Sequence, residues 1–253
     1  MSEKRVAIVT GAAQGMGEVF AHRLANDGFY VVALDVKDSV SKVSKAINNN
    51  SDRSAYKILD LSSNFETIDK SIHDIAQEYG NLEVLINNAG LATGGPSEEV
   101  LEKDWILGRS VMLDAVFYAS KSFANILLSK KSMGSIVNIG SITGMSGWSQ
   151  RITYGVAKSG VIQLTKVLGV EWANKGIRVN AISPGQVETP INEEVFRKGL
   201  ADRKTFTNRA PLKRFADPSE IAHFVSFLCS QDAAYITGQN FVVDGGWNVW
   251  GQM

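Results

Sequence analysis

Three polar side chains near the middle of the chain have the chemistry to move a proton on and off an alcohol oxygen. Tyr154 and Lys158 are four residues apart in a segment that predicts a helix over residues 150–174, so both lie on one helix face. A phenol loses its proton at about pH 10, and a neighbouring cation lowers that pKa. We interpret Tyr154 as a general acid/base and Lys158 as the cation that lowers its pKa.

The third side chain is the hydroxyl of Ser141, which closely follows the apolar run 135–139. That run predicts a buried strand, whose end would present the hydroxyl to the phenol. Lowering the phenol pKa by roughly two to three units requires about 3–4 kcal/mol. We expect a buried ammonium and a positively charged ligand ring to supply this together. Because Tyr and Lys occur at this spacing in many helices by chance, the trio has to be judged with the elements that position it.

Short apolar runs recur along the chain and alternate with segments of helical pattern. The runs are almost continuously apolar, as strands are when helices cover both faces of a sheet. Such alternation predicts a parallel sheet in an open α/β fold. No linker or break in composition divides the chain, so we predict one domain over residues 1–253. The predicted strands comprise residues 6–10, 30–34, 55–59, 84–86, 135–139, 178–182 and 241–243.

A glycine-rich turn joins the first predicted strand to a helix over residues 18–27. Gly11 would let the chain turn tightly off the strand, and Gly15 and Gly17 would let backbone approach a phosphate and the helix pack close to the sheet. The helix N-terminus offers free amides and a positive dipole to a pyrophosphate. Between a first strand and a first helix, this pattern predicts a dinucleotide site.

Asp35 ends the second predicted strand, 18 residues after Gly17. A carboxylate there can accept hydrogen bonds from both hydroxyls of an adenosine ribose, and its charge would repel a ribose phosphate. The sequence therefore favours NAD over NADP as the cofactor. Lys37 is close enough to keep NADP open as an alternative.

Composition excludes several classes of protein. The 253 residues carry 26 basic and 26 acidic side chains, and such a balance does not favour nucleic-acid binding. The single cysteine, Cys229, fits a reducing cytoplasmic compartment. We expect no membrane span, because no apolar run approaches the required length, and no signal peptide. The three histidines have no partners at metal-ligand spacing, so we expect no catalytic metal.

The sequence resembles the classical short-chain dehydrogenases/reductases over nearly its whole length. The resemblance is carried by the glycine turn at residues 10–17, the Asn-Asn-Ala-Gly run at 87–90, Ser141, the Tyr154/Lys158 pair and Pro184-Gly185. It implies a three-layer Rossmann-like fold with a seven-stranded parallel sheet and helices on both faces. It also implies hydride transfer between a nicotinamide and an alcohol or carbonyl carbon, and a homotetramer.

The resemblance also assigns roles to residues. Tyr154 is the general acid/base, Lys158 also holds the nicotinamide ribose, and Ser141 binds the substrate oxygen. By the same analogy, residues 60 and 61 lie at the adenine, and residues 87 and 90 lie beside the adenosine half of the cofactor. Residues 187 and 189 lie at the carboxamide of the nicotinamide. The alternative for Thr189 is a simple helix cap before Pro190. The expected cofactor-binding residues are Gly11, Gln14, Gly15, Met16, Gly17, Asp35, Asp60, Leu61, Asn87, Gly90, Tyr154, Lys158, Val187 and Thr189.

One position departs from the family pattern. The family usually has an Asn seven residues after a Trp in the helix that follows the fourth strand, and Met112 stands there after Trp105. In the family this Asn helps to hold a water of a proton relay, and a thioether is at best a poor hydrogen-bond acceptor. We expect activity to be retained, either because backbone groups hold the water or because the proton takes another route.

The substrate end is less well determined. We expect substrate to enter under a long irregular loop over residues 186–216. Arg151 is near enough to Tyr154 to grip an anionic group, although a surface arginine paired with an acid is the alternative. Together, Arg151 and Trp148 suggest a small polar or anionic hydroxy compound as the substrate. Two aromatic residues near the C-terminus, Trp247 and Trp250, suggest burial against a neighbouring subunit or against their own chain.

The leading hypothesis is an NAD(H)-dependent oxidoreductase that interconverts a secondary alcohol and a ketone. One alternative is a 3-oxoacyl thioester reductase that uses NADPH, which Asp35 disfavours. An alternative of another class is a non-catalytic dinucleotide sensor or scaffold. Met112 favours that alternative, and the intact trio of Ser141, Tyr154 and Lys158 opposes it.

Overall fold

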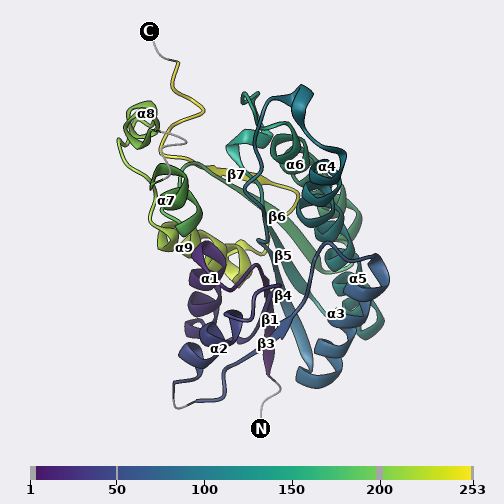
Figure 1. Ribbon diagram of the computed structural model, residues 1–253. Helices are drawn as coiled ribbons and strands as arrows, with labels where there is room; N and C mark the ends of the chain where they lie inside the picture. The colour runs from purple at the N-terminus through teal and green to yellow at the C-terminus, as the bar shows by residue number, and fades with distance from the viewer. Residues whose placement is uncertain (1–3, 50, 198–201, 252–253) are drawn as a thin grey trace.

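The computed structural model describes residues 4–49, 51–197 and 202–251, and its strands form one seven-stranded parallel sheet in the order β3-β2-β1-β4-β5-β6-β7 (Figure 1). The prediction of a seven-stranded parallel sheet is confirmed. The strands are β1 Arg5–Thr10, β2 Tyr30–Asp35, β3 Ser54–Ile58, β4 Asn81–Asn87, β5 Gly134–Ile139, β6 Ile177–Pro184 and β7 Asn240–Val243.

Helices cover both faces of the sheet (Figure 1). The helices α1, α2 and α9 pack on one face and α3, α5 and α6 on the other. The α-helices are α1 Gly15–Asn26, α2 Val40–Asn48, α3 Phe65–Tyr79, α4 Glu102–Arg109, α5 Ala115–Lys130, α6 Ile152–Ala173, α7 Pro190–Arg197, α8 Arg203–Arg209 and α9 Pro218–Cys229. Short helical turns are η1 Ser97–Glu99, the π-helical η2 Ser110–Asp114, η3 Ile142–Gly144 and η4 Gln231–Ala233.

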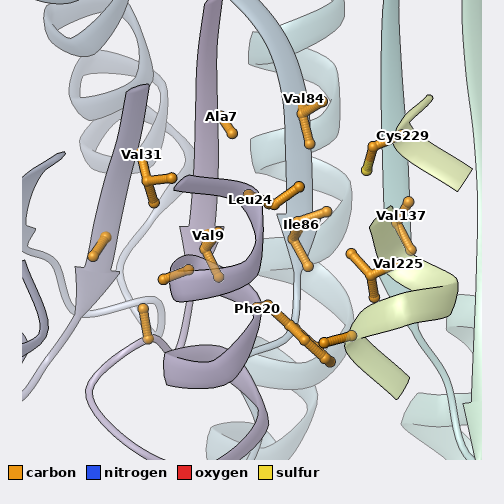
Figure 2. Packing of buried hydrophobic residues seen from close by; sticks show 14 of the residues in the cluster. Ala7, Val9, Phe20, Leu24, Val31, Val84, Ile86, Val137, Val225 and Cys229 are labelled. Carbon is orange, nitrogen blue, oxygen red and sulfur yellow. The ribbon is translucent and has the colours of Figure 1, made fainter. Parts of the chain in front are cut away.

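The pleat of each strand divides the apolar side chains between two cores. In β1, Ala7 and Val9 join the core under α1, α2 and α9, whereas Val6 and Ile8 join the core under α3, α5 and α6. Successive strand side chains point to opposite faces, so a strand covered on both sides must be apolar throughout. Figure 2 shows the first core, where Phe20 of α1 approaches α9 above the sheet.

The order of the strands determines where a ligand can bind. The chain runs outward from β1 to β2 and β3, then returns to β4 on the other side of β1. In open parallel sheets, a crevice forms at such a switch point, outside the carboxyl ends of the strands. The glycine turn after β1 and the segment after β4 both begin at that edge.

The structure corrects the statement that no apolar run approaches the length of a membrane span. Residues Glu102–Lys130 form a continuous helical stretch that is long and apolar enough, by length and composition, to cross a membrane. In the structure 61% of its apolar window is buried, and α5 packs against the sheet and α3. The apolar composition of this segment is therefore explained by burial within the fold.

The region 186–216 is less irregular than predicted, because it contains α7 and α8. The carboxylate of Asp202 begins α8 by accepting hydrogen bonds from the amides of Lys204 and Thr205, which satisfies two free amides of the first turn. Residues 198–201 of the predicted substrate loop lie outside the described residues.

Candidate active site

The first turns of α6 carry the predicted acid/base and its cation. Tyr154 is half-buried in the first turn, and Lys158 follows on the same face with only 3% of its surface exposed. The Nζ atom of Lys158 donates to the carbonyl of Ile139, at the end of β5, over 2.6 Å, and lies 5.7 Å from the centre of the Tyr154 ring. The structure thus brings the predicted pair together at the carboxyl end of β5.

Ser141 completes the trio from the other side. It begins the short helix η3, and its Oγ accepts from the amide of Thr143 at 3.2 Å and from the hydroxyl of Thr143 at 2.7 Å. With Thr143 donating, the Ser141 hydroxyl is free to donate its own proton to another oxygen. Thr143 therefore orients the hydroxyl, a role that the sequence pattern did not suggest.

Burial acts on the pKa values of both Tyr154 and Lys158. Burial raises the pKa of the Tyr154 phenol, whereas its hydrogen bond with Ser141 and the positive charge of Arg151 lower that pKa only in part. Burial also lowers the pKa of Lys158 to about 8. Removing both groups from water disfavours both charged forms. The lowering of the phenol pKa by Lys158 together with a positively charged ligand ring stays a prediction.

The glycine turn is tightly packed on itself. An added methyl group at Gly17 would lie 2.1 Å from the carbonyl oxygen of Gly11, and Gly11 and Gly15 have φ angles of +65° and +62°, which side chains disfavour. The side chain of Asn88 donates to the carbonyls of Thr10 and Gly11 at 3.0 and 3.1 Å. Asn88 thus ties the segment after β4 to the turn after β1.

The hydroxyl of Thr10 reinforces this connection. It donates to the carbonyl of Ile86 at 3.2 Å and accepts from the amides of Asn88 and Ala89 at 3.0 and 3.2 Å. Thr10 and Asn88 belong to runs that the sequence marked, yet we had assigned neither of them a role. Their positions directly after β1 and β4, which are neighbours in the sheet, are the signal that would have identified them.

The start of α1 fits a dinucleotide pyrophosphate. Gln14 is the residue before this helix, and its side chain makes no capping hydrogen bond to the first turn. Amides at a helix N-terminus without a side-chain partner, beside glycines that leave room above the backbone, attract phosphate oxygens. Met16, also predicted here, is partly buried against the core.

Asp35 ends β2 beside this turn, as predicted. Its carboxylate accepts from the amides of Ala13 and Lys37, each at 2.9 Å. Each carboxylate oxygen keeps acceptor capacity for a ribose hydroxyl. The ammonium of Lys37 donates to the side-chain oxygen of Gln14 at 3.0 Å, so a cation also stands at the edge of the turn.

Asp60 and Leu61 directly follow β3, next to the end of β2. The amide of Leu59 donates to the carbonyl of Asp35 at 2.9 Å, which holds this segment beside Asp35. The Asp60 carboxylate accepts from the amide and hydroxyl of Ser62, and Leu61 is buried. These positions agree with an adenine-side location, and their contact with a cofactor stays a prediction.

The side chain of Asn87 does not face the cofactor crevice. It donates to the Ser120 hydroxyl at 3.0 Å and to the side-chain oxygen of Asn138 at 2.8 Å, and Asn138 donates to the hydroxyl of Thr165 at 2.9 Å. All of these side chains are buried. Only the backbone atoms of Asn87 are therefore available for the expected contact with the adenosine half of the cofactor.

Met112 lies in the π-helical turn η2, directly opposite the segment after β4. It is fully buried in a small apolar cluster with Ala157, and Tyr154 packs against that cluster. A methyl group at Gly90 would lie 4.0 Å from its sulfur. A π-helical turn changes the register of backbone hydrogen bonds and is frequent at functional sites. The position that the family pattern reserves for Asn thus belongs to an apolar cluster against which the ring of Tyr154 packs.

The segment after β6 returns over the glycine turn. A methyl group at Gly15 would lie 3.8 Å from the Cβ of Thr189, so this residue stands opposite the turn. Val187 is buried and pairs with Ala216 in an isolated bridge. The hydroxyl of Thr189 accepts from the amide of Asn192 at 3.4 Å, a weak cap of α7 that leaves the predicted cofactor contact open.

The two tentative substrate residues have partners within the chain. Arg151 donates from Nη1 to the carbonyl of Thr93 at 2.8 Å. Trp148 stacks on Trp247, with ring centres 5.3 Å apart. Trp247 is part of an aromatic cluster on the substrate side, and Trp250 lies under the ammonium of Lys213. The aromatic cluster consists of Trp148, Phe196, Phe206, Phe215 and Trp247.

In residues 4–49, 51–197 and 202–251, the His, Cys, Asp and Glu side chains form no group of three that could hold a metal ion. The candidate site at this edge of the sheet consists of the glycine turn and the trio of Ser141, Tyr154 and Lys158. A parallel α/β sheet with a phosphate-fitting glycine turn and a Ser-Tyr-Lys trio above its switch point defines a nucleotide-dependent oxidoreductase.

Comparison with known proteins identifies the family. A profile described as enoyl-(acyl carrier protein) reductase matches residues 11–248. The chain is 34% identical over 248 residues to the 3-oxoacyl-(acyl-carrier-protein) reductase FabG of Thermotoga maritima, covering 96% of this chain and 98% of that protein. It is also 34% identical to the meso-2,3-butanediol dehydrogenase of Serratia marcescens, covering 96% and 94%. The chain belongs to the short-chain dehydrogenase/reductase family.

A solved structure of similar sequence supports this. A candidate 2-deoxy-D-gluconate 3-dehydrogenase from Agrobacterium tumefaciens, with bound NADP, superposes with a TM-score of 0.90 at 35% identity over 98% of both chains. The family, the fold and the trio together make this chain an oxidoreductase that acts on CH–OH groups with a nicotinamide dinucleotide. The predicted family is thus confirmed, and the choice between NAD and NADP stays open.

Proposed function

We propose that this protein interconverts a secondary alcohol and a ketone of a small polar or anionic hydroxy compound, with NAD(H) as cofactor. The observation that carries the proposal is the convergence of Ser141, Tyr154 and Lys158 at the carboxyl end of β5, on the same edge of the sheet as the glycine turn after β1. When bound, the dinucleotide would accept or deliver the hydride. The chain's own groups would bind the substrate oxygen and move its proton.

Each member of the trio has a separate task. The Ser141 hydroxyl, oriented by Thr143, would donate to the substrate oxygen. The Tyr154 phenol would exchange the proton with that oxygen. The buried Lys158 ammonium, held by the carbonyl of Ile139, would hold the nicotinamide ribose. Because burial raises the pKa of the phenol, the additional positive charge of an oxidised nicotinamide ring would favour the phenolate when an alcohol is oxidised.

The first experiment removes the phenolic oxygen. Tyr154→Phe keeps the ring in the apolar cluster around Met112, so the fold should be retained. We expect kcat for the best substrate to fall by at least about a hundredfold, the lower range for loss of a general acid/base. Circular dichroism and NADH titration would check that the variant is folded and still binds the dinucleotide. A Tyr154→Phe variant that turns over at the parent rate would disprove the proposed chemistry.

The preference for NAD is supported by the charge of Asp35 at the end of β2. The opposing features are Lys37 beside Gln14 and the NADP bound in the Agrobacterium structure. We expect kcat/KM to be higher with NAD than with NADP. Asp35→Asn keeps the side-chain shape and removes the charge, so it should raise kcat/KM for NADP relative to NAD by about tenfold, as expected for roughly 1.4 kcal/mol. A parent enzyme that prefers NADP would overturn this part of the proposal.

The substrate class is supported by Arg151 and by two structural neighbours. Besides the candidate 2-deoxy-D-gluconate 3-dehydrogenase, a candidate NAD(P)-dependent gluconate 5-dehydrogenase from Beutenbergia cavernae superposes with a TM-score of 0.91 at 34% identity, covering 98% of both chains. Hydroxy acids of this kind combine an alcohol with an anion. A panel of neutral alcohols, hydroxy acids and their ketones, read by NADH absorbance, would test this class.

The alternative is reduction of a 3-oxoacyl thioester. The similarity to the Thermotoga reductase supports it, and Asp35 opposes it if NADPH is required. The same panel should include a 3-oxoacyl thioester and an enoyl thioester, since the matching profile is described as an enoyl reductase. NADPH oxidation with the 3-oxoacyl thioester alone would favour the alternative.

A non-catalytic dinucleotide sensor is the alternative of another class. Only the apolar Met112 at the relay position supports it. Binding of NADH without turnover of any compound on the panel, and recovery of activity in Met112→Asn, would show that a missing relay had silenced the site. A cytoplasmic location remains a proposal from the single cysteine, and a homotetramer remains a proposal from the family resemblance. Sedimentation of the purified protein would test the assembly.

A further inference from the structure

The start of α6 is fastened to the segment that follows β4. Nη1 of Arg151 donates to the carbonyl of Thr93 at 2.8 Å, and the amide of Gly95 donates to the carbonyl of Gln150 at 3.0 Å. These two hydrogen bonds run in opposite directions between the two segments. We call the four residues Thr93, Gly95, Gln150 and Arg151 the clasp.

The clasp is closely fitted. A methyl group at Gly94 would lie 3.2 Å from Nη1 of Arg151 and 3.3 Å from the carbonyl oxygen of Gln150. Gln150 itself has a φ of +63°, a conformation that costs free energy for a residue with a side chain and persists only where the surroundings hold it. The chain therefore accepts backbone strain in order to make this connection.

The catalytic turn begins directly after the clasp. The carbonyl of Arg151 accepts from the amide of Gly155 at 2.7 Å, so Arg151 is the residue on which the first turn of α6 is built. On the other side, a methyl group at Gly108 of α4 would lie only 2.3 Å from Cγ2 of Thr153. The turn that carries Tyr154 is thus held between α4 and the clasp.

Arg151 also places a positive charge beside the phenol. That charge lowers the pKa of Tyr154, against the larger effect of burial. Among the described residues, the other charged groups here are Lys158 on α6, and Glu99 and Asp104, which line a cavity of about 190 Å³ together with Arg151. The guanidinium therefore combines a mechanical and an electrostatic connection to Tyr154.

We propose that Arg151 is a positioning residue for the reaction: through the clasp it fixes the catalytic turn of α6 and keeps a positive charge beside the Tyr154 hydroxyl. This inference rests on the proposed role of Tyr154 as acid/base. It differs from the use of Arg151 as an anchor for an anionic substrate, because a positioning residue affects every substrate, whether charged or neutral.

The test compares Arg151→Met and Arg151→Lys with the parent enzyme. Methionine keeps the length of the side chain without its charge or donors, and lysine keeps the charge. Arg5→Met is the matched control, since Arg5 is half-exposed, pairs with Glu83 and lies at the opposite end of the sheet. For each variant, kcat and KM are measured from pH 6 to pH 10, a range of about two units on either side of Lys158's lowered pKa, with one neutral and one anionic alcohol from the panel.

For Arg151→Met we expect kcat to fall on the order of tenfold to a hundredfold for both alcohols, as when a reacting group is misplaced, with KM nearly unchanged. The pH midpoint of the rise in alcohol oxidation should move upward, because the phenol has lost a positive neighbour. Arg151→Lys should keep the midpoint near that of the parent and recover part of kcat. Arg5→Met should behave like the parent.

A second variant opens the clasp without changing any charge. Gly94→Ala adds a methyl group 3.2 Å from Nη1 of Arg151, and we expect it to lower kcat for both alcohols by a smaller factor than Arg151→Met. Unfolding measurements on all variants would identify any that fail to fold, and folded Gly94→Ala then still tests the connection.

Two results would overturn the inference. One is a rise in KM confined to the anionic alcohol, with kcat and the pH midpoint unchanged, which would make Arg151 a substrate anchor only. The other is a parent-like pH midpoint and kcat in both Arg151→Met and Gly94→Ala. The Tyr154→Phe variant distinguishes failure of this inference from failure of the proposed function. If Tyr154→Phe is inactive while Arg151→Met has the kcat and pH midpoint of the parent, only the positioning role of Arg151 is wrong.

Discussion

The glycine turn after β1 and the aromatic cluster on the substrate side lie at the same edge of the sheet, yet they are held together in different ways. The turn is held by backbone: Gly17 packs on the carbonyl of Gly11, and Asn88 bridges two carbonyls. The cluster is held by side chains from distant segments, such as Trp148 stacked on Trp247. An added methyl group at Gly11 or Gly17 would meet backbone atoms in the first region, whereas contacts between rings hold the second.

This difference suggests that the glycine turn binds the dinucleotide and that the aromatic cluster forms a wall for the substrate. A dinucleotide pyrophosphate needs backbone amides at fixed positions, which a tightly packed turn provides. A substrate wall needs a shape that side chains can define. Arg209 illustrates the second kind of construction, since it donates to the carbonyl of Trp250 at 3.0 Å and lies 5.6 Å from the ring of Trp247.

The largest effect is expected at the turn. In Gly17→Ala the added methyl group would lie 2.1 Å from the Gly11 carbonyl oxygen, so the turn must move. We expect NADH affinity to fall on the order of a hundredfold, as for a misplaced binding group, and the free energy of unfolding to fall by about 2 kcal/mol from overpacking. NADH fluorescence titration and urea unfolding measure the two effects. Gly147→Ala is the control on the substrate side, because no atom lies within 4 Å of its added carbon. Equal losses of NADH affinity and stability in Gly17→Ala and Gly147→Ala would contradict the difference between the two regions.

Lys158, which is buried at the carboxyl end of β5, gives a pH-dependent prediction. Burial lowers its folded-state pKa to about 8, while the unfolded chain keeps it at about 10.4. Between these values the unfolded chain binds more protons, so this group makes stability rise with pH from about 8 to about 10.4. The unfolding free energy of the parent minus that of Lys158→Met should rise by up to about 3 kcal/mol across this window. Urea unfolding of both proteins at several pH values measures it, and a flat difference would contradict the burial of a charged ammonium.

The two neighbouring asparagines give a third comparison. Asn87→Ala leaves the side-chain oxygen of Asn138 without a donor inside the sheet core, and should lower the free energy of unfolding by about 2 kcal/mol. Asn88→Ala frees two carbonyls at the glycine turn, so it should weaken NADH binding more than Asn87→Ala does. Unfolding and NADH titration on the two variants measure this. The reverse order of NADH affinities would show that Asn87 itself holds the cofactor through its side chain.

The smallest effect is expected in the aromatic cluster. Trp247→Ala removes the stack on Trp148 and should lower the free energy of unfolding by about 1 kcal/mol. NADH affinity should stay at the parent value, because the glycine turn does not depend on this side chain. Thermal unfolding and NADH titration test both statements. A Trp247→Ala variant that lost NADH binding would show that the two regions are coupled.

Several features followed from the sequence because they depend on residues that are near one another in the chain. Short, almost continuously apolar runs that alternate with helical segments predict strands covered on both faces, and runs such as 6–10 and 135–139 thus predicted the sheet. Three glycines between a strand and a helix similarly predicted the turn. The pair Tyr154 and Lys158 shares a face because of the helical repeat alone.

Other features were decided only when distant segments met. Whether Asn87 faces the crevice or the core depends on which polar side chains α5 and β5 bring to it. The pKa of Tyr154 depends on its burial, which no local pattern reports. The carbonyl of Thr93, which accepts a hydrogen bond from the guanidinium of Arg151, is a partner that no local pattern indicates.

The amino-acid sequence by itself thus determined the strands and the glycine turn, and predicted the trio of Ser141, Tyr154 and Lys158, because periodicity and backbone conformation are local properties. Only the tertiary structure decided how charged the trio is, which way Asn87 faces and what holds the catalytic turn. These depend on desolvation and on hydrogen bonds between segments that are dozens of residues apart, and both arise only when the layers pack.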